Sequence, residues 1–296
     1  MENAILLIIH VLFVVGIFVT IKLSNHNKQN TYQILSVNYL IATVISYFEC
    51  KSSVIDTIYH ASWLVSFSGI IIGSFFILNF LLMFASTQKV GIGITTVLNK
   101  TSLIIPVIIG YFFLGQTNSA LNKLIGVAIC IFAFYFIFYS KSNNTNKSIS
   151  IAALLLPISV FFASGFTDTS MEVVNKFVLS GQNQKSVFLL LIFGTAFFLS
   201  VILVITDALK GSKFKLSVLL YGSALGSFNY MGSKMLLINV ERMGGSIVFP
   251  VLNASVVILT TIVGYLFFKE TFTKRQWTGI ALAVASVAVI ASTLAN

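Results

Sequence analysis

Four ionisable side chains lie inside long apolar runs of this chain, where a charge is costly. They are Lys100, Asp168, Glu172 and Lys234. On insertion scales an ionised side chain at the centre of a membrane helix costs about 2.5 kcal/mol or more, so each needs a partner, a cavity or a function. A lysine there can bind a carboxylate or phosphate, and a carboxyl group there can bind a cation or exchange a proton. The four residues indicate a polar site at membrane depth.

Asp168 and Glu172 are four residues apart, so they share one face of a helix, which Lys176 extends. Two close carboxylates repel each other and a nearby lysine attracts them, so such a group can load and release a proton. This pattern predicts proton coupling at Asp168 or Glu172. Fixed ion pairs with Lys100, Lys234 or Lys176 explain the same residues. A helix that ends early, leaving Glu172 at the membrane surface, is a further alternative.

Lys100 lies about ten residues into its apolar run, far from either end. Gly93 and Thr96 fall on the same helix face, and Pro106 follows at a position that can break the backbone ladder. A polar face beside a helix break is typical of ligand sites at the middle of a membrane. We therefore expect Lys100 to line a cavity, with snorkelling to the membrane surface as the alternative. Lys234 lies nearer a helix end, so both interpretations stay open for it.

Uncharged polar residues complete the candidate site. A single asparagine in a membrane helix more often bonds a neighbouring helix than a ligand, and the pair Asn99 and Asn253 is the stronger candidate because it recurs in a repeat described below. The predicted substrate-binding residues are Lys100, Asn99, Asn253, Lys234, Asn229, Asn79 and Thr96. Nucleophile-elbow, Walker and H-E-x-x-H motifs are missing from the sequence. We predict no catalytic residue, no metal site and no cofactor.

Two stretches of the chain repeat each other at a shift of 154 positions. They are Val97–Thr117 (VLNKTSLIIPVIIGYFFLGQT) and Val251–Thr271 (VLNASVVILTTIVGYLFFKET). A second match, at a shift of 153, pairs the Gly-x-x-x-Gly-Ser-Phe run at Gly69 with the one at Gly222. Each copy carries an odd number of apolar runs, so the second must enter the membrane from the opposite side. This arrangement is an inverted-topology repeat.

Apolar runs of about the length that a membrane helix needs predict the fold class. We expect an all-α membrane protein of ten transmembrane helices, arranged as two inverted five-helix repeats around a central cavity. The repeats span residues 1–140 and 151–296, joined by a polar linker at 141–150. The ten expected helices are 4–22, 33–49, 63–85, 91–114, 120–139, 151–174, 186–206, 216–238, 245–268 and 275–294.

Composition excludes an ordinary soluble domain. Hydrophobic residues make up 57% of the 296 positions and charged residues 9%, against roughly a quarter charged in soluble proteins. The net charge of +10 comes from basic residues scattered through short loops, which favours topology signals over nucleic-acid binding. Cys50 and Cys130 have no metal-ligand spacing, and we expect no disulfide between them. The first apolar run lacks the flanks of a signal peptide, so we expect a retained helix.

The loops predict an orientation. Most lysines follow the odd-numbered helices, among them Lys22, Lys89, Lys141, Lys213 and Lys274. By the positive-inside rule, the linker then lies in the cytoplasm and both termini lie outside.

The ten apolar runs, their five-plus-five repeat and the proline-bearing fourth run, which ends in an aromatic-rich stretch, resemble the drug/metabolite transporter superfamily, specifically its EamA-like members, over essentially the whole chain. Phe267-Phe268-Lys269-Glu270, followed by Trp277-Thr278-Gly279, is similar to the close of the fourth helix and the start of the fifth in that family. The first copy departs from it by carrying Gln116 where glutamate is usual. The resemblance implies a central cavity and alternating access driven by gradients rather than ATP. It also implies cytosolic termini in eukaryotic relatives, against the charge count.

A second, local resemblance concerns Leu98-Asn99-Lys100, which looks like the signature of nucleotide-sugar transporters. That signature normally belongs to the second half of the chain, whereas here it lies in the first.

The expected function is a secondary active transporter in the bacterial plasma (inner) membrane. We expect a small polar or anionic metabolite as substrate, proton coupling or exchange, and export as one of the open directions. The expected partners are the substrate and membrane lipid, without nucleic acid, in a monomer or homodimer. A broad exporter of drugs and cations is the alternative within the same fold. A non-transporting scaffold or a lipid-handling enzyme is the alternative outside it.

Overall fold

The computed structural model is all-helical over the residues that it describes, which are 2–50, 53–105, 109, 120–138, 151–243 and 245–294. The helices of this part of the chain are α1 (Glu2–His26), α2 (Thr31–Glu49), α3 (Val54–His60), α4 (Trp63–Val90), α5 (Ile92–Thr101), α7 (Ala120–Phe138), α8 (Ile151–Phe177), α9 (Gly181–Ala208), α10 (Ser217–Met243), α11 (Gly245–Phe267) and α12 (Lys274–Leu294).

Short polar breaks separate the helices because capping residues start and stop them locally. The Asn30 side chain accepts hydrogen bonds from the Tyr32 and Gln33 amides at the start of α2, and Ser62 accepts one at the start of α4. Gly91, at φ +93°, separates α4 from α5 with no loop between them.

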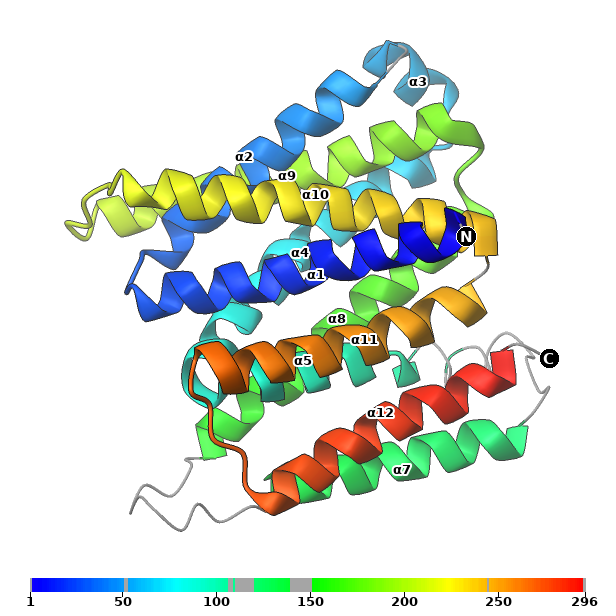
Figure 1. The fold of residues 1–296 in the computed structure, drawn as a ribbon. Coiled ribbons are helices and arrows are strands. Elements are labelled where there is room, and N and C mark those ends of the chain that lie inside the picture. Colours follow the sequence, from blue (N-terminus) through cyan, green and yellow to red (C-terminus); the bar gives the residue numbers. More distant parts are fainter. Residues whose placement is uncertain are drawn as a thin grey trace.

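The long helices run back and forth between two ends of the molecule (Figure 1). One end, which we call the terminal end, holds Glu2 of α1 and Leu294 of α12. The opposite end, which we call the basic end, holds the loops with Lys28, Lys89 and Lys213. Helix α1 begins at the terminal end, whereas α8 begins at the basic end.

Each of the ten expected apolar runs overlaps a helix. For the run at 91–114, only its first part is described, as α5 and a short continuation, and Pro106 and Gly110–Thr117 lie outside the described residues. Helix α3 was not expected, because its seven residues follow from local capping by Ser53 rather than from an apolar run. By length and composition, three of the described helices are long and apolar enough to cross a membrane: α1, α4 and the Asn183–Ala208 part of α9.

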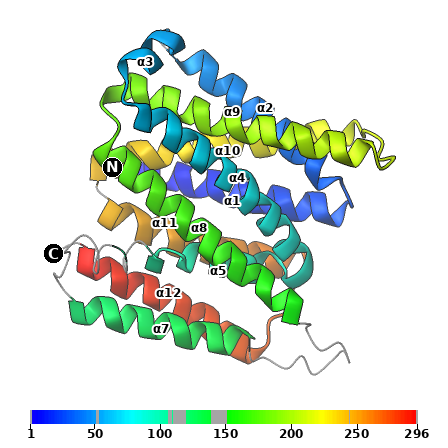
Figure 2. The same cartoon turned by 180° about the vertical axis from the view of Figure 1, so that it is seen from behind.

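The two halves of the chain exchange packing partners (Figures 1 and 2). Helix α4 packs against α8 and α9, and α10 packs against α1 and α2. In the same way α5 contacts α8, α11 contacts α1, and α7 pairs with α12. The contacts of α4 with α8 and α9 therefore correspond to those of α10 with α1 and α2, and the α5–α8 contact corresponds to the α11–α1 contact.

The matched glycines lie at close contacts between the helices. A Cβ added at Gly73 of α4 would lie 2.5 Å from the carbonyl oxygen of Ile192 on α9. A Cβ added at Gly226 of α10 would lie 2.5 Å from the carbonyl oxygen of Asn38 on α2. Small residues let membrane helices approach this closely, so the glycine pairs of the repeat fix equivalent crossings in the two halves.

The outward faces of the helices are apolar. Phe48, Phe67, Phe162 and Phe198 are all more than half exposed. Exposed apolar surface over so many helices is what a lipid-facing protein presents and a water-soluble monomer avoids.

Candidate functional site

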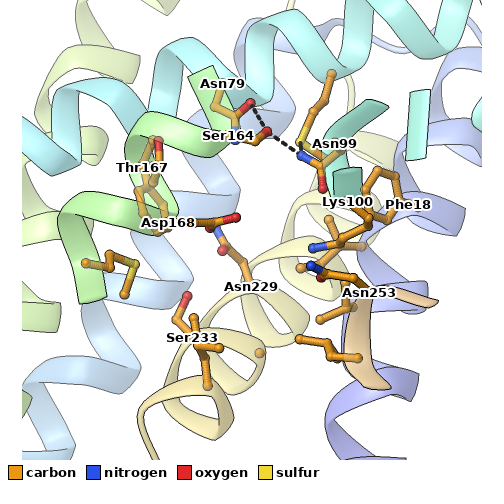
Figure 3. Close-up of a pocket in the computed structure, with 18 of the residues that line it drawn as sticks. Phe18, Asn79, Asn99, Lys100, Ser164, Thr167, Asp168, Asn229, Ser233 and Asn253 are labelled. Atoms are coloured by element: carbon orange, nitrogen blue, oxygen red, sulfur yellow. Dashed lines mark hydrogen bonds between the residues drawn. The ribbon is translucent and has the colours of Figure 1, made fainter. Parts of the chain in front are cut away.

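A cavity of about 120 Å³ lies between six helices, α1, α4, α5, α8, α10 and α11 (Figure 3). Its lining residues occupy the middle of α4 and, on α8 and α10, the half nearer the terminal end. All six helices supply polar lining residues: His10, Asn79, Asn99, Lys100, Ser164, Thr167, Asp168, Asn229, Ser233 and Asn253. Polar residues that are far apart in the sequence therefore line one cavity.

Lys100 occupies the last turn of α5, which ends at Thr101. The carbonyls freed by that helix end are bonded locally, because Thr101 Oγ1 donates to the Val97 oxygen at 2.7 Å and Ser102 Oγ donates to the Asn99 oxygen at 2.5 Å. A cation is favoured at a helix C-terminus, where the macrodipole is negative. The early end of α5 therefore gives Lys100 a place inside an apolar run.

Asp168 of α8 lies across the cavity from Lys100 (Figure 3). Both side chains are partly buried. Among the described residues, neither has a hydrogen-bond partner or an ion-pair partner within 4.0 Å. The fixed Lys100–Asp168 ion pair considered from the sequence is absent from this part of the chain, and both charged groups face the cavity.

Amide side chains form part of the cavity wall. Asn99 Nδ2 donates to Ser164 Oγ at 2.5 Å, and Ser164 Oγ donates to Asn79 Oδ1 at 3.0 Å, which joins α5, α8 and α4. Asn229 Nδ2 donates to Asn38 Oδ1 of α2 at 3.3 Å. Asn253, the repeat counterpart of Asn99, also lines the cavity, and no side-chain hydrogen bond to it occurs among the described residues.

Sequence reasoning missed several lining residues. Ser164 could have been found from Asp168, because residues four apart share a helix face, whereas Thr167, next to Asp168 in the chain, is not given by that spacing. His10 is buried, lines the cavity, and its Nδ1 lies 3.3 Å from Asn239 Nδ2. The apolar lining, including Phe18, carries no signal that separates it from ordinary core residues.

Three residues of the expected site do not line this cavity. Thr96 is fully buried and its hydroxyl donates to the Ile92 oxygen of its own helix at 2.8 Å. Glu172 is exposed, one turn beyond Asp168 towards the end of α8. Lys234 forms an ion pair with Glu49 at 2.5 Å. Glu49, the last residue of α2, is therefore the partner of Lys234, in place of Glu172 or a ligand in this cavity.

The Lys234 pair belongs to a second cavity, of about 290 Å³, at the terminal end. It lies where α2 and α10 end and α9 begins, and a second pair, Lys185–Glu241 at 3.0 Å, lines it too. The Lys234–Glu49 pair joins α10 of the second half to α2 of the first, and the Lys185–Glu241 pair joins α9 and α10 within the second half.

At the basic end, Glu270 ties three helices together. Its carboxylate accepts hydrogen bonds from the Ile92 amide at 2.8 Å and the Gly93 amide at 3.2 Å, and Lys22 of α1 donates to it at 2.6 Å. Backbone amides at a helix N-terminus are a natural anion site. Here the helix is α5, and the anion is the carboxylate of Glu270, which follows α11 in the chain. Gly91 and Gly264 leave room for the carboxylate, since a Cβ at either would lie within 3 Å of it. The counterpart in the first repeat, Gln116, lies outside the described residues.

Comparison with known proteins supports the same fold. A solved crystal structure of a protein matches with a TM-score of 0.62 at 13% identity, covering 97% of this chain and 96% of its own; at this identity the likeness shows the fold alone. An uncharacterized protein of Haemophilus influenzae is 25% identical over 286 residues, covering 95% of both chains.

A family model also matches. The model described as the EamA-like transporter family covers residues 150–292, the second half of the chain. Its members are integral membrane transporters, which agrees with the apolar outer surface and with the lack of enzyme motifs in the sequence. Residues 150–292 of this chain thus match the EamA-like transporter family, part of the drug/metabolite transporter superfamily.

Proposed function

We propose that this protein is a secondary active transporter that moves a small polar or anionic metabolite through the cavity between its two halves. The observation that carries the proposal is that Lys100, inside an apolar run, faces a cavity and has no ion-pair partner among the described residues. Lys100 supplies positive charge to the substrate, while Asn99, Asn229, Asn253 and Asn79 orient it through hydrogen bonds. Lys234 and Thr96 support the helices from outside this space.

The size of the cavity favours a small substrate over the drug-exporter alternative. Sites for drug-sized ligands enclose roughly 300–1,000 Å³, whereas this cavity encloses about 120 Å³. A lysine in the wall also disfavours lipophilic cations, because like charges repel.

Alternating access by a ten-helix inverted repeat is the mechanism that we propose. Its support is the exchange of packing partners between the halves, with equivalent close contacts at Gly73 and Gly226. The Glu270 network would close the basic end while the cavity faces the terminal end. Rocking one half against the other would break that network and close the opposite end.

Coupling to protons is assigned to Asp168 rather than Glu172, because Asp168 faces the cavity and Glu172 does not. The other titratable groups that line the cavity are Lys100 and His10. Exchange of one solute for another remains the rival form of coupling. We place the protein in a bacterial inner membrane.

The first experiment is uptake into proteoliposomes of radiolabelled organic acids, amino acids and sugar phosphates. We expect uptake of at least one compound by the wild type and roughly tenfold or greater loss in Lys100→Met, because one desolvated charge contact is worth about 1.5–3 kcal/mol. Lys176→Met, an exposed lysine at the end of α8, is the matched control and keeps uptake. Unchanged uptake in Lys100→Met would remove Lys100 from the site and with it the proposal.

The same liposomes test coupling. An imposed pH gradient accelerates wild-type uptake if the transporter is proton-coupled. We expect Asp168→Asn to abolish this acceleration and Glu172→Gln to keep it. The reverse result would move the coupling carboxylate to Glu172, and no acceleration in the wild type would favour solute exchange.

A further inference from the structure

The cavity wall contains a histidine whose role is not yet explained. His10 of α1 lies on the face of that helix that lines the cavity, together with Val14, Ile17 and Phe18. Residues at this spacing form one stripe along a helix. His10 is buried, with 1% of its surface exposed. A histidine ring can be a neutral donor, a neutral acceptor or a cation, so its role depends on where its hydrogen lies.

The residue behind the ring determines the position of that hydrogen. Asn239 of α10 is fully buried and is not part of the cavity lining, and its Nδ2 lies 3.3 Å from His10 Nδ1. An amide nitrogen donates and does not accept, so His10 Nδ1 accepts this hydrogen bond and carries no hydrogen. The hydrogen of the neutral ring is therefore on Nε2. A second hydrogen, on Nδ1, would point at the N–H of Asn239.

The other ring nitrogen borders the cavity. His10 Nε2 has no hydrogen-bond partner among the described residues. It is also not one of their completely enclosed atoms without a partner, which include Asn239 Oδ1. Nε2 therefore borders open space, and the space that His10 lines is the cavity. A contact that only joined α1 to α10 would not need the second nitrogen of the ring to be open.

We infer that His10 contacts the substrate as a neutral donor, offering its Nε2–H to an acceptor oxygen, and that Asn239 is the positioning residue that holds the ring in this form. This inference rests on the proposed function and adds two residues to its site. A carboxylate, phosphate, carbonyl or hydroxyl oxygen can accept this hydrogen bond, whereas an ammonium group cannot. Lys100 lines the same cavity and also only donates, so both side chains select the oxygen-bearing end of the substrate.

Nitrogen NMR of the full-length protein in nanodiscs measures the position of the hydrogen. The sequence contains three histidines, and the other two, His26 and His60, are exposed. His26→Gln combined with His60→Gln therefore leaves one isotope-labelled ring to observe at neutral pH. We expect a neutral His10 with its hydrogen on Nε2. A hydrogen on Nδ1, or on both nitrogens, would overturn the inference.

Asn239→Asp, made in the same background, tests the positioning role of Asn239. A carboxylate accepts a hydrogen bond, and imidazole is the stronger base of the two groups, so we expect a hydrogen to appear on Nδ1 of His10. An unchanged spectrum would show that Asn239 does not set the form of the ring. The spectrum with Asn239 in place decides the position of the hydrogen even where Asn239→Asp fails to fold.

Uptake kinetics test the contact with the substrate. The probes are the radiolabelled organic acids, amino acids and sugar phosphates of the proteoliposome experiment. His10→Phe keeps a ring without a donor, and His10→Gln keeps a neutral N–H. We expect His10→Phe to raise the KM of the transported compound roughly tenfold, as for the loss of one hydrogen bond, and His10→Gln to recover most of that loss. His26→Gln combined with His60→Gln is the control and keeps the wild-type KM.

The outcomes separate this inference from the proposed function. Wild-type uptake with an unchanged KM in His10→Phe would overturn the contact with the substrate and leave the metabolite transporter intact. Equal losses in His10→Phe and His10→Gln would show that the ring matters and its donor does not, which also overturns the inference alone. If the wild type takes up none of these compounds, the proposed function fails, and the substrate contact of His10 fails with it.

Discussion

At the scale of single residues, one serine hydroxyl joins three helices at the cavity wall. Ser164 Oγ accepts from Asn99 on α5 and donates to Asn79 on α4, so Ser164→Ala leaves two amide groups without this partner. An unsatisfied buried polar group costs about 1–3 kcal/mol. We expect Ser164→Ala to lower the unfolding free energy by about that amount, measured as a lower melting temperature of the purified protein.

The control is Ser74→Ala on α4. The Ser74 hydroxyl donates only within its own helix, to the Ile70 oxygen at 2.9 Å, so its loss is expected to change stability by no more than about 0.5 kcal/mol. If Ser164→Ala were as stable as this control, the relay of hydrogen bonds across the three helices would not hold the cavity wall.

At the scale of helices, the matched glycines fix the crossings between the two halves. A Cβ at Gly73 or Gly226 would lie 2.5 Å from a backbone oxygen of the facing helix, and a backbone atom cannot move aside as a flexible side chain can. We expect Gly73→Ala and Gly226→Ala each to destabilise the protein by about 1–3 kcal/mol through overpacking, measured by thermal unfolding in detergent.

Gly194 of α9 provides the matched control. A Cβ there meets nothing within 4 Å, so Gly194→Ala should be neutral or stabilising by up to about 1 kcal/mol from helix propensity. A loss of stability in Gly194→Ala equal to that in Gly73→Ala would show that alanine itself, and not the close helix contact, is the cause.

At the scale of the whole molecule, the charges are distributed unevenly between the two ends. The basic end gathers Lys28, Lys89, Lys210, Lys213, Lys215 and Lys274, whereas Glu2, Glu49, Asp56 and Glu241 lie towards the terminal end. The positive-inside rule then predicts the basic end in the cytoplasm. In a Cys50→Ser background, Asp56→Cys should react with a membrane-impermeant maleimide in intact cells.

The second labelling site is Lys213→Cys, which is exposed in the loop between α9 and α10. It should react only after the cells are permeabilised. Labelling of Lys213→Cys in intact cells, with Asp56→Cys protected, would reverse the orientation and place both termini in the cytoplasm.

The sequence by itself determined the features that depend on neighbours along the chain. Apolar runs predict the helices because a buried or lipid-facing helix must be apolar over its whole length. Lys100, Asp168, Asn99 and Asn253 could be chosen because a polar group inside such a run is costly and therefore has a reason to be there. Of the expected candidates, these are among the six that the fold brings to one cavity.

Only the tertiary structure decided which groups meet across helices. Lys234, like Lys100, is a lysine inside an apolar run. The end of α2 nevertheless places Glu49 beside Lys234, a contact between residues 185 positions apart. Glu172 shares a face with Asp168, but α8 has carried it beyond the cavity by that point. Helical periodicity fixes the face of a helix that a residue occupies, and the crossing of one helix over another decides which part of that face meets a cavity, a partner charge or lipid.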